Sequence, residues 1–158
     1  MNPLALALLI LVLGGVGAPV AIDIAVGDRI YPDSPLYPIE RWGERVELTI
    51  YVMVNRSAEF MARLAAERAD EALHALEANM TDVAIELLRE SNASAAPCLS
   101  AGEPLPARGY PWCAEWGEKV YHVMSAARSR GSPAVEAVAR EVYEGASRSG
   151  WAPVSRAG

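Results

Sequence analysis

The chain has 158 residues, of which 52% are hydrophobic and 22% charged, which fits one modest folded domain and excludes a disordered chain. Its net charge of −6 argues against partners that need a basic surface, namely nucleic acids and anionic lipids. Glutamine is absent and asparagine is scarce, a trait of proteins from thermophiles such as hot-environment archaea, although the codon usage of a GC-rich genome explains it equally well.

The N-terminal segment predicts export. Residues 4–13 read LALALLILVL and are followed by GGVGAPVA, which is typical of a secretory apolar region and its small-residue cleavage site. We therefore predict a signal peptide over residues 1–18. Residues 4–22 carry no charge, so an uncleaved membrane anchor is the alternative, and a buried cytosolic helix is a third interpretation. The first two place the body of the protein outside the membrane, extracellular or at the cell surface, with only this segment in the bilayer.

A linker over residues 19–34 is expected to end at the proline-rich corner YPDSPLYP. Proline fixes its own φ angle and suits the first turn of a helix. Either Ser34 and Pro35, or Tyr37 and Pro38 one turn later, are predicted to be the N-cap and the first helical residue.

Three apolar residues of this corner are given a packing role. Leu36 and Tyr37 are expected to fold back on the first turns as a hydrophobic staple. Trp42 is expected to be buried on the core face of the helix. A ligand-binding lip made by Tyr37 and Trp42 is the functional alternative.

Apolar residues recurring every three or four positions predict five amphipathic helices after the corner. The second half of the first helix, VELTIYVMV, also alternates at period two, so a strand over residues 46–54 stays open. Because each helix is apolar on one side only, the helices must share a core. The sequence therefore predicts an all-α fold, a small antiparallel bundle of about five helices.

The boundaries of these helices follow from local signals. Ser57 and Thr81 are expected to be the N-caps of the second and third helices. Gly131 should end the fourth helix, and Ser132 and Pro133 should start the fifth. The predicted regions are a helical hairpin region over 35–92, a Pro/Gly-rich loop over 93–113, a C-terminal hairpin over 114–150 and a tail over 151–158.

Two cysteines, Cys98 and Cys113, stand at the ends of the Pro/Gly-rich loop. In an exported protein such a pair predicts a disulfide that closes a short loop. The spacing is not that of a Cys-x-x-Cys redox motif or a zinc knuckle.

Three of the four asparagines lie in glycosylation sequons, Asn-x-Ser/Thr, at Asn55, Asn79 and Asn92. Only 13 of the 158 residues are Ser or Thr, so this frequency by chance is improbable. We predict glycan on at least one of them. The alternative interpretation is that these residues mark helix caps and turns.

The segment PDSPLYPIERWGERVEL, followed by FMARLAAERADEAL, resembles a family of uncharacterised prokaryotic domains, domain of unknown function family 5667. The resemblance covers roughly residues 31–90 and implies an exported or anchored N-terminus and a helix over VELTIYVMV. It implies no activity. Ala66 departs from the family pattern by standing as an extra alanine before Glu67. The matching positions are Pro32, Ser34, Pro35, Leu36, Tyr37, Leu64, Ala65, Glu67 and Arg68.

No catalytic, cofactor-binding or metal-ligating residue is assigned. Glu71 and His74 have the Glu-x-x-His spacing of bundle metal sites, but both are expected on the wet side of the second helix. The predicted function is a structural or partner-binding module, with an unknown protein partner or a second copy. The alternative is an envelope sensor or an exported enzyme whose site near the disulfide loop would use Glu115, Glu118 and His122.

Overall fold

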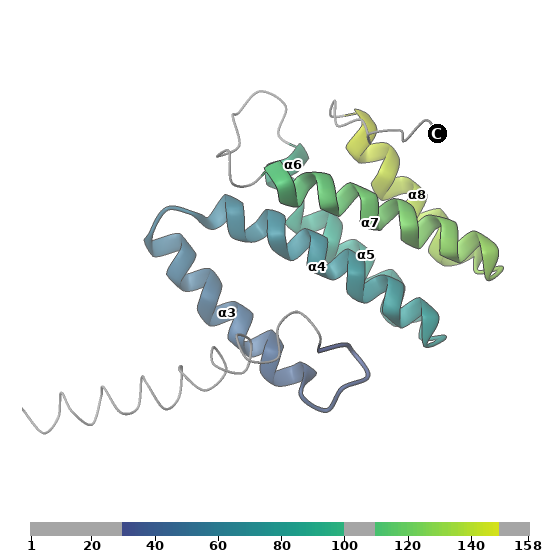
Figure 1. The fold of residues 1–158 in the computed structure, drawn as a ribbon, viewed down its shortest axis with the longest axis horizontal. Coiled ribbons are helices and arrows are strands. Elements are labelled where there is room, and N and C mark those ends of the chain that lie inside the picture. The colour runs from purple at the N-terminus through teal and green to yellow at the C-terminus, as the bar shows by residue number, and fades with distance from the viewer. Residues whose placement is uncertain (1–29, 100–109, 149–158) are drawn as a thin grey trace, which may run out of the picture. The chain divides into compact units, whose positions relative to one another are not determined.

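A computed structural model describes residues 30–99 and 110–148, and all of the regular structure in those ranges is helical. The all-α prediction is confirmed, and residues 46–54 belong to a helix rather than a strand except at its end. The helices are α3 (Tyr37–Met53), α4 (Ser57–Glu77), α5 (Thr81–Ser94), α6 (Ala96–Leu99), α7 (Tyr110–Ser129) and α8 (Pro133–Arg148) (Figure 1).

The chain divides into two compact units between Asn55 and Arg56. The described part of the first unit is residues 30–55 and holds α3. The second unit holds all the later helices. The predicted signal peptide, anchor and most of the linker, and the tail over 151–158, lie outside the described residues, as do residues 100–109 of the loop.

The first unit begins with tight turns that lead into α3. The Ser34 N–H donates to the Tyr31 carbonyl at 2.8 Å, and the Tyr37 N–H donates to the Ser34 carbonyl at 3.1 Å. α3 starts at Tyr37 with Leu36 as N-cap and with Pro38 in its first turn. The helix therefore starts at the later of the two predicted places, one residue earlier than proposed. The Ser34 hydroxyl caps the turn instead, because it accepts from the Leu36 N–H at 3.2 Å.

The packing roles expected for Leu36 and Trp42 are not what the structure shows. Leu36 is 42% exposed and Trp42 is 44% exposed, so neither forms a buried staple or core contact. The Arg41 guanidinium lies over the Tyr37 ring, 5.9 Å from its centroid, in a cation–π contact. The residues of α3 that are buried are Glu40 and Gly43.

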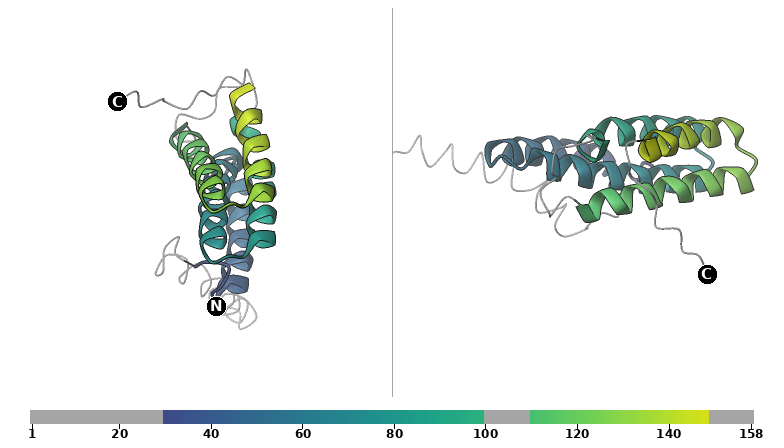
Figure 2. Two further views of the ribbon diagram at one scale, coloured as in Figure 1. Left: turned by 90° about the vertical axis from the view of Figure 1, so that its right-hand side faces the viewer. Right: turned by 90° about the horizontal axis from the view of Figure 1, so that it is seen from above.

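The second unit is a four-helix bundle. α4 packs on α5 and α7, and α8 packs on the other side of both, so the four helices form a closed ring with α5 and α7 diagonal to each other. The short α6 lies against α4, α5 and α8 at one end (Figures 1 and 2).

The core of the bundle divides into two clusters along its length. Near the α4–α5 turn, Leu76, Leu88 and Val123 pack with residues of α8. Near α6, Trp116 and Val120 pack with Ala65 and Ala69. Residue numbers rise along α4 and α7 in the same sense from one cluster to the other, so these two helices run parallel, whereas α5 and α8 run the opposite way.

The side chains that α4 turns toward the core are unusually small. Six alanines of this helix are fully buried, and they face both the α5 and the α7 sides of the bundle. The helices therefore contact α4 through small side chains, which permits close approach of the backbones. These alanines are Ala62, Ala65, Ala66, Ala69, Ala72 and Ala75.

Helix boundaries differ from the predictions in two ways. Ser57 and Thr81 are the first helical residues of α4 and α5, and the N-caps are Arg56 and Met80, neither of which caps with its side chain. The predicted loop over 93–113 is largely helical where it is described, since α5 continues to Ser94, α6 follows and α7 already begins at Tyr110. Pro97 and Pro111 are the second residues of their helices, where proline is tolerated.

The end of α7 lies where Gly131 predicts it, and α4 ends in the same way. Asn79 and Gly131 follow these helices with positive φ angles of 61° and 66°. The Met80 N–H donates to the Ala75 carbonyl at 2.8 Å, and the Ser132 N–H donates to the Ala127 carbonyl at 2.9 Å, as in a Schellman motif. α8 then starts at Pro133 as expected.

Within residues 30–99 and 110–148, every helix is too short or too polar to cross a lipid bilayer.

Candidate functional site

The disulfide between Cys98 and Cys113 joins α6 to the first turns of α7. The two sulfur atoms are 2.00 Å apart and the two Cα atoms 5.5 Å apart. Cys113 is 3% exposed and belongs to the buried core, and Cys98 packs on the cluster that contains Trp116. The disulfide is thus part of the packed core of the bundle.

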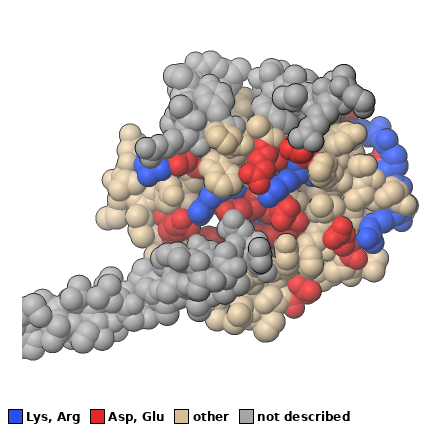
Figure 3. Space-filling model, viewed as in Figure 1, with Lys and Arg blue, Asp and Glu red and all other residues tan. Residues whose placement is uncertain are grey.

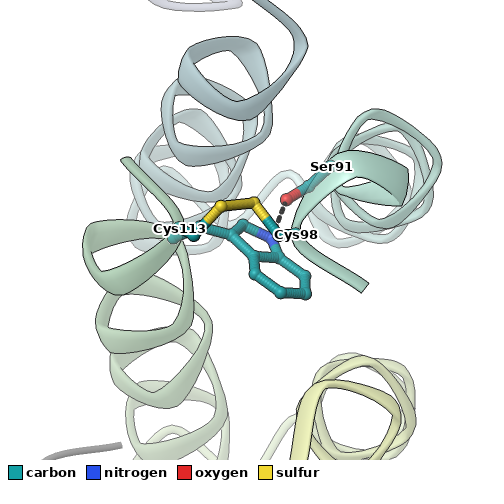
Figure 4. Close-up of a disulfide and its surroundings, with 4 residues drawn as sticks. Ser91, Cys98 and Cys113 are labelled. Carbon is teal, nitrogen blue, oxygen red and sulfur yellow. Dashed lines mark hydrogen bonds between the residues drawn. A yellow bond between two sulfur atoms is a disulfide. The ribbon is translucent and has the colours of Figure 1, made fainter. Parts of the chain in front are cut away.

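A buried hydrogen-bond chain lies beside the disulfide and ties three helices together. The Trp116 indole N–H of α7 donates to the Ser91 hydroxyl of α5 at 2.9 Å (Figure 4). This hydroxyl donates to the Ala65 carbonyl of α4 at 2.7 Å. Trp116 and Ser91 are fully buried. The indole N–H and the Ser91 hydroxyl hydrogen each have an acceptor. The large indole ring is therefore buried without an unsatisfied hydrogen-bond donor.

We expect the double variant Cys98→Ala/Cys113→Ala to lose about 3 kcal/mol of unfolding free energy, since the bridge closes a short loop of the unfolded chain. Urea denaturation monitored by circular dichroism measures the loss. Native protein should also resist thiol-reactive reagents until it is reduced and unfolded. Rapid labelling of the native wild type would contradict the disulfide.

α4 also carries a buried ion pair. The Arg68 guanidinium contacts the Glu71 carboxylate one turn later on α4, and its Nε lies 3.4 Å from the Glu90 carboxylate of α5. The Arg68 side chain is 1% exposed and the Glu71 side chain 9% exposed. The prediction that Glu71 lies on the wet side of α4 was therefore wrong. Two charges removed from water need this mutual contact, because either one alone would be strongly disfavoured.

Lys119, the only lysine of the chain, links α7 to α4. Its ammonium lies 2.9 Å from the Glu115 carboxylate and 3.6 Å from the Asp70 carboxylate. Burial alone would lower the pKa of Lys119, but the hydrogen bonds and charges of Glu115 and Asp70 outweigh it and raise the pKa above 10.5. Figure 3 shows acidic and basic side chains interspersed over the viewed face, as such pairs require.

The three residues of the alternative enzyme hypothesis all lie on α7. Glu115 is engaged by Lys119, whereas Glu118 and His122 are exposed on the surface of α7. The His122 ring lies 6.3 Å from the Tyr121 ring, between centroids. Among the described residues, no cluster of histidine, cysteine, aspartate and glutamate has the arrangement of a metal site, and Glu71 is engaged by Arg68.

Glu136 ties the start of α8 to the end of α7. Its carboxylate accepts from Arg140 at 2.6 Å and from Arg128 at 3.0 Å. The hydrogen bonds from Arg140 and Arg128 hold the pKa of Glu136 below its usual value of 4.5. A contact with the ionised form stabilises the folded state above that pH, and the stabilisation is lost as the pH falls through the lowered pKa of the folded protein.

The variant Glu136→Gln should therefore show a weaker dependence of melting temperature on pH below pH 4.5 than the wild type. Thermal melts at stepped pH, followed by circular dichroism, measure the two slopes. Identical acid profiles for the two proteins would contradict the role of this carboxylate.

The three sequon asparagines are all exposed. Asn55 and Asn79 follow α3 and α4 with positive φ angles, a conformation that asparagine tolerates better than most residues. These two positions therefore have a backbone reason to be asparagine, as the alternative interpretation holds. Asn92 lies within the last turn of α5, and Ser94 of its sequon is buried. Glycan at these sites stays a prediction.

Sequence analysis missed the buried polar groups, although their positions carried a signal. Arg68 stands three residues after Ala65 and four before Ala72, which places it on the apolar stripe of α4. Ser91 likewise follows Leu87 and Leu88 at helical spacing. A polar residue in register with an apolar stripe marks a buried partner, here Glu71 and Trp116 respectively.

Residues 29–105 match the family model described as Domain of unknown function (DUF5667). The chain is similar to this family over that stretch. The resemblance predicted over roughly residues 31–90 is thereby confirmed, and the match is longer than predicted. Searches of curated proteins and of solved structures gave no match.

The DUF5667 match does not coincide with a folding unit. It begins in the first unit and includes α4, α5 and α6, but it ends before α7 and α8. Those two helices complete the bundle that α4 and α5 begin, and the disulfide joins Cys98 inside the match to Cys113 outside it. The DUF5667 segment therefore buries its core in this protein only together with the sequence that follows it.

Proposed function

We propose that this protein is an exported, non-catalytic helical module at the cell surface, with a structural or partner-binding role. The observation that carries the proposal is the disulfide set into the bundle core beside Trp116. Disulfides persist in oxidising compartments and are rare in the cytosol. The apolar N-terminal sequence of residues 4–13 supports the same location.

The non-catalytic part of the proposal is supported by the structural contacts made at the disulfide end of the bundle. Trp116 fills this region and is hydrogen-bonded to Ser91, and Lys119 engages the nearest candidate acid, Glu115. Each group makes a contact that holds helices together. The partner is a protein or a second copy of this chain, since an acidic chain of net charge −6 disfavours nucleic acid.

Intact mass spectrometry of protein from the native host, taken separately from membrane and medium, tests the proposal. We expect either the full chain in the membrane or a chain lacking residues 1–18 in the medium, with a mass that rises by two hydrogens on reduction of the Cys98–Cys113 bridge. We also expect glycan mass at one or more of Asn55, Asn79 and Asn92. A full-length, thiol-containing chain in the cytosol would overturn the proposal.

A further inference from the structure

The apolar side of α3 is exposed, whereas a residue of its charged side is buried. Glu40 is only 9% exposed. The apolar stripe of α3 is the exposed side, with exposed fractions from 40% to 82% at four of the five positions and partial burial at the fifth. Surface helices normally show the reverse, and an exposed apolar stripe marks an interaction site. The stripe is formed by Ile39, Trp42, Val46, Ile50 and Met53.

The sequence before α3 indicates what covers this stripe. Residues 4–22 carry no charge and are long enough to reach across most of a bilayer. Residues 23–36 separate this segment from α3, and a chain of that length extends at most about 50 Å. If the segment stays in the membrane, α3 is held close to the bilayer surface at a high local concentration.

The chemistry of the stripe suits a lipid interface. It carries no charged side chain, and it contains Trp42, a residue type that collects at the boundary between headgroups and acyl chains. The net charge of −6 favours uncharged headgroups over anionic ones. We infer that α3 lies along the surface of a zwitterionic bilayer with its apolar stripe in the acyl boundary. This inference rests on the proposed export and selects its anchored form.

Fluorescence quenching in lipid tests the orientation of α3. The full chain is reconstituted into phosphatidylcholine vesicles with bromine on the upper acyl chain, which quenches tryptophan on contact. The signal of Trp42 is obtained as the difference between the wild type and Trp42→Phe. We expect this signal to fall about two-fold relative to vesicles without bromine, because an interfacial helix buries its apolar face about 5–10 Å deep.

A matched pair of reporters separates the two sides of the helix. Ile50→Trp and Val52→Trp are each placed in the Trp42→Phe background. Ile50 and Val52 are similarly exposed, at 48% and 59%, but two residues apart they point to nearly opposite sides. We expect about two-fold quenching at position 50 and none at position 52.

Each other outcome overturns the inference. Equal quenching at both positions would mean unspecific insertion. No quenching at either, in chain that sediments with the vesicles, would leave the anchor standing and assign the stripe to another occupant. A doubled mass in detergent by light scattering would then identify a second copy, and an unchanged mass the rest of this chain. Chain that stays in the supernatant would remove the anchored form and this inference with it.

Discussion

Trp116→Ala is expected to destabilise the bundle by about 3–5 kcal/mol. The indole is fully buried in the cluster next to the disulfide, and its removal leaves a large cavity among alanines that cannot fill it. The Ser91 hydroxyl also loses its donor, although it keeps its bond to the Ala65 carbonyl. Urea denaturation followed by far-ultraviolet circular dichroism measures the change in unfolding free energy.

Two control variants show whether burial is the cause. Trp42→Ala should change the unfolding free energy by about 0.5 kcal/mol or less, because that ring is 44% exposed in water. Trp116→Phe keeps most of the volume and removes the indole donor, so its loss should lie between the two. Equal losses at positions 42 and 116 would show that the first unit packs more tightly than its exposure indicates.

Glu71→Ala is expected to cost about 3 kcal/mol or more, because it leaves the Arg68 guanidinium, whose side chain is 1% exposed, buried without its contact to the Glu71 carboxylate. The double variant Arg68→Met/Glu71→Leu replaces both charges by apolar side chains of similar length. It should recover most of that stability, since an apolar pair of matching volume is often as stable as a buried ion pair.

Arg140→Ala provides the surface control. It removes one partner of Glu136, but its side chain is 53% exposed, so the loss should be about 0.5 kcal/mol. Differential scanning calorimetry ranks the three variants by melting temperature. If the double variant is as unstable as Glu71→Ala, the ion pair stabilises the fold more than an apolar pair does. Its two charges would then do more than offset the cost of each other's burial.

The sequence predicted the fold well where apolar periodicity and burial coincide. In α7 and α8 most of the apolar residues that recur every three or four positions are buried, and Gly131 and Pro133 stand at the predicted turn between these helices. In α3 the same periodicity predicted a core face, yet Trp42 and Ile50 are exposed. Periodicity identifies an apolar side but not what that side contacts.

The contacts at the disulfide end were only half predictable. The pairing of Cys98 with Cys113 followed from their position at the ends of one loop and from the expected compartment. The helical continuation through Ser94, α6 and the start of α7 did not, because a stretch rich in proline and glycine predicts a loop. Pro97 and Pro111 stand instead in the first turns of α6 and α7, where the missing N–H needs no partner.

The alanine face of α4 has a consequence for the entropy of folding. A buried leucine loses about 0.5–1 kcal/mol of rotamer freedom, whereas alanine has none to lose. The six buried alanines of α4 therefore become ordered at no side-chain entropic cost. They also bury less apolar surface, so the gain from each is smaller. When the bundle melts, the disorder released by this face of α4 is almost entirely that of the backbone.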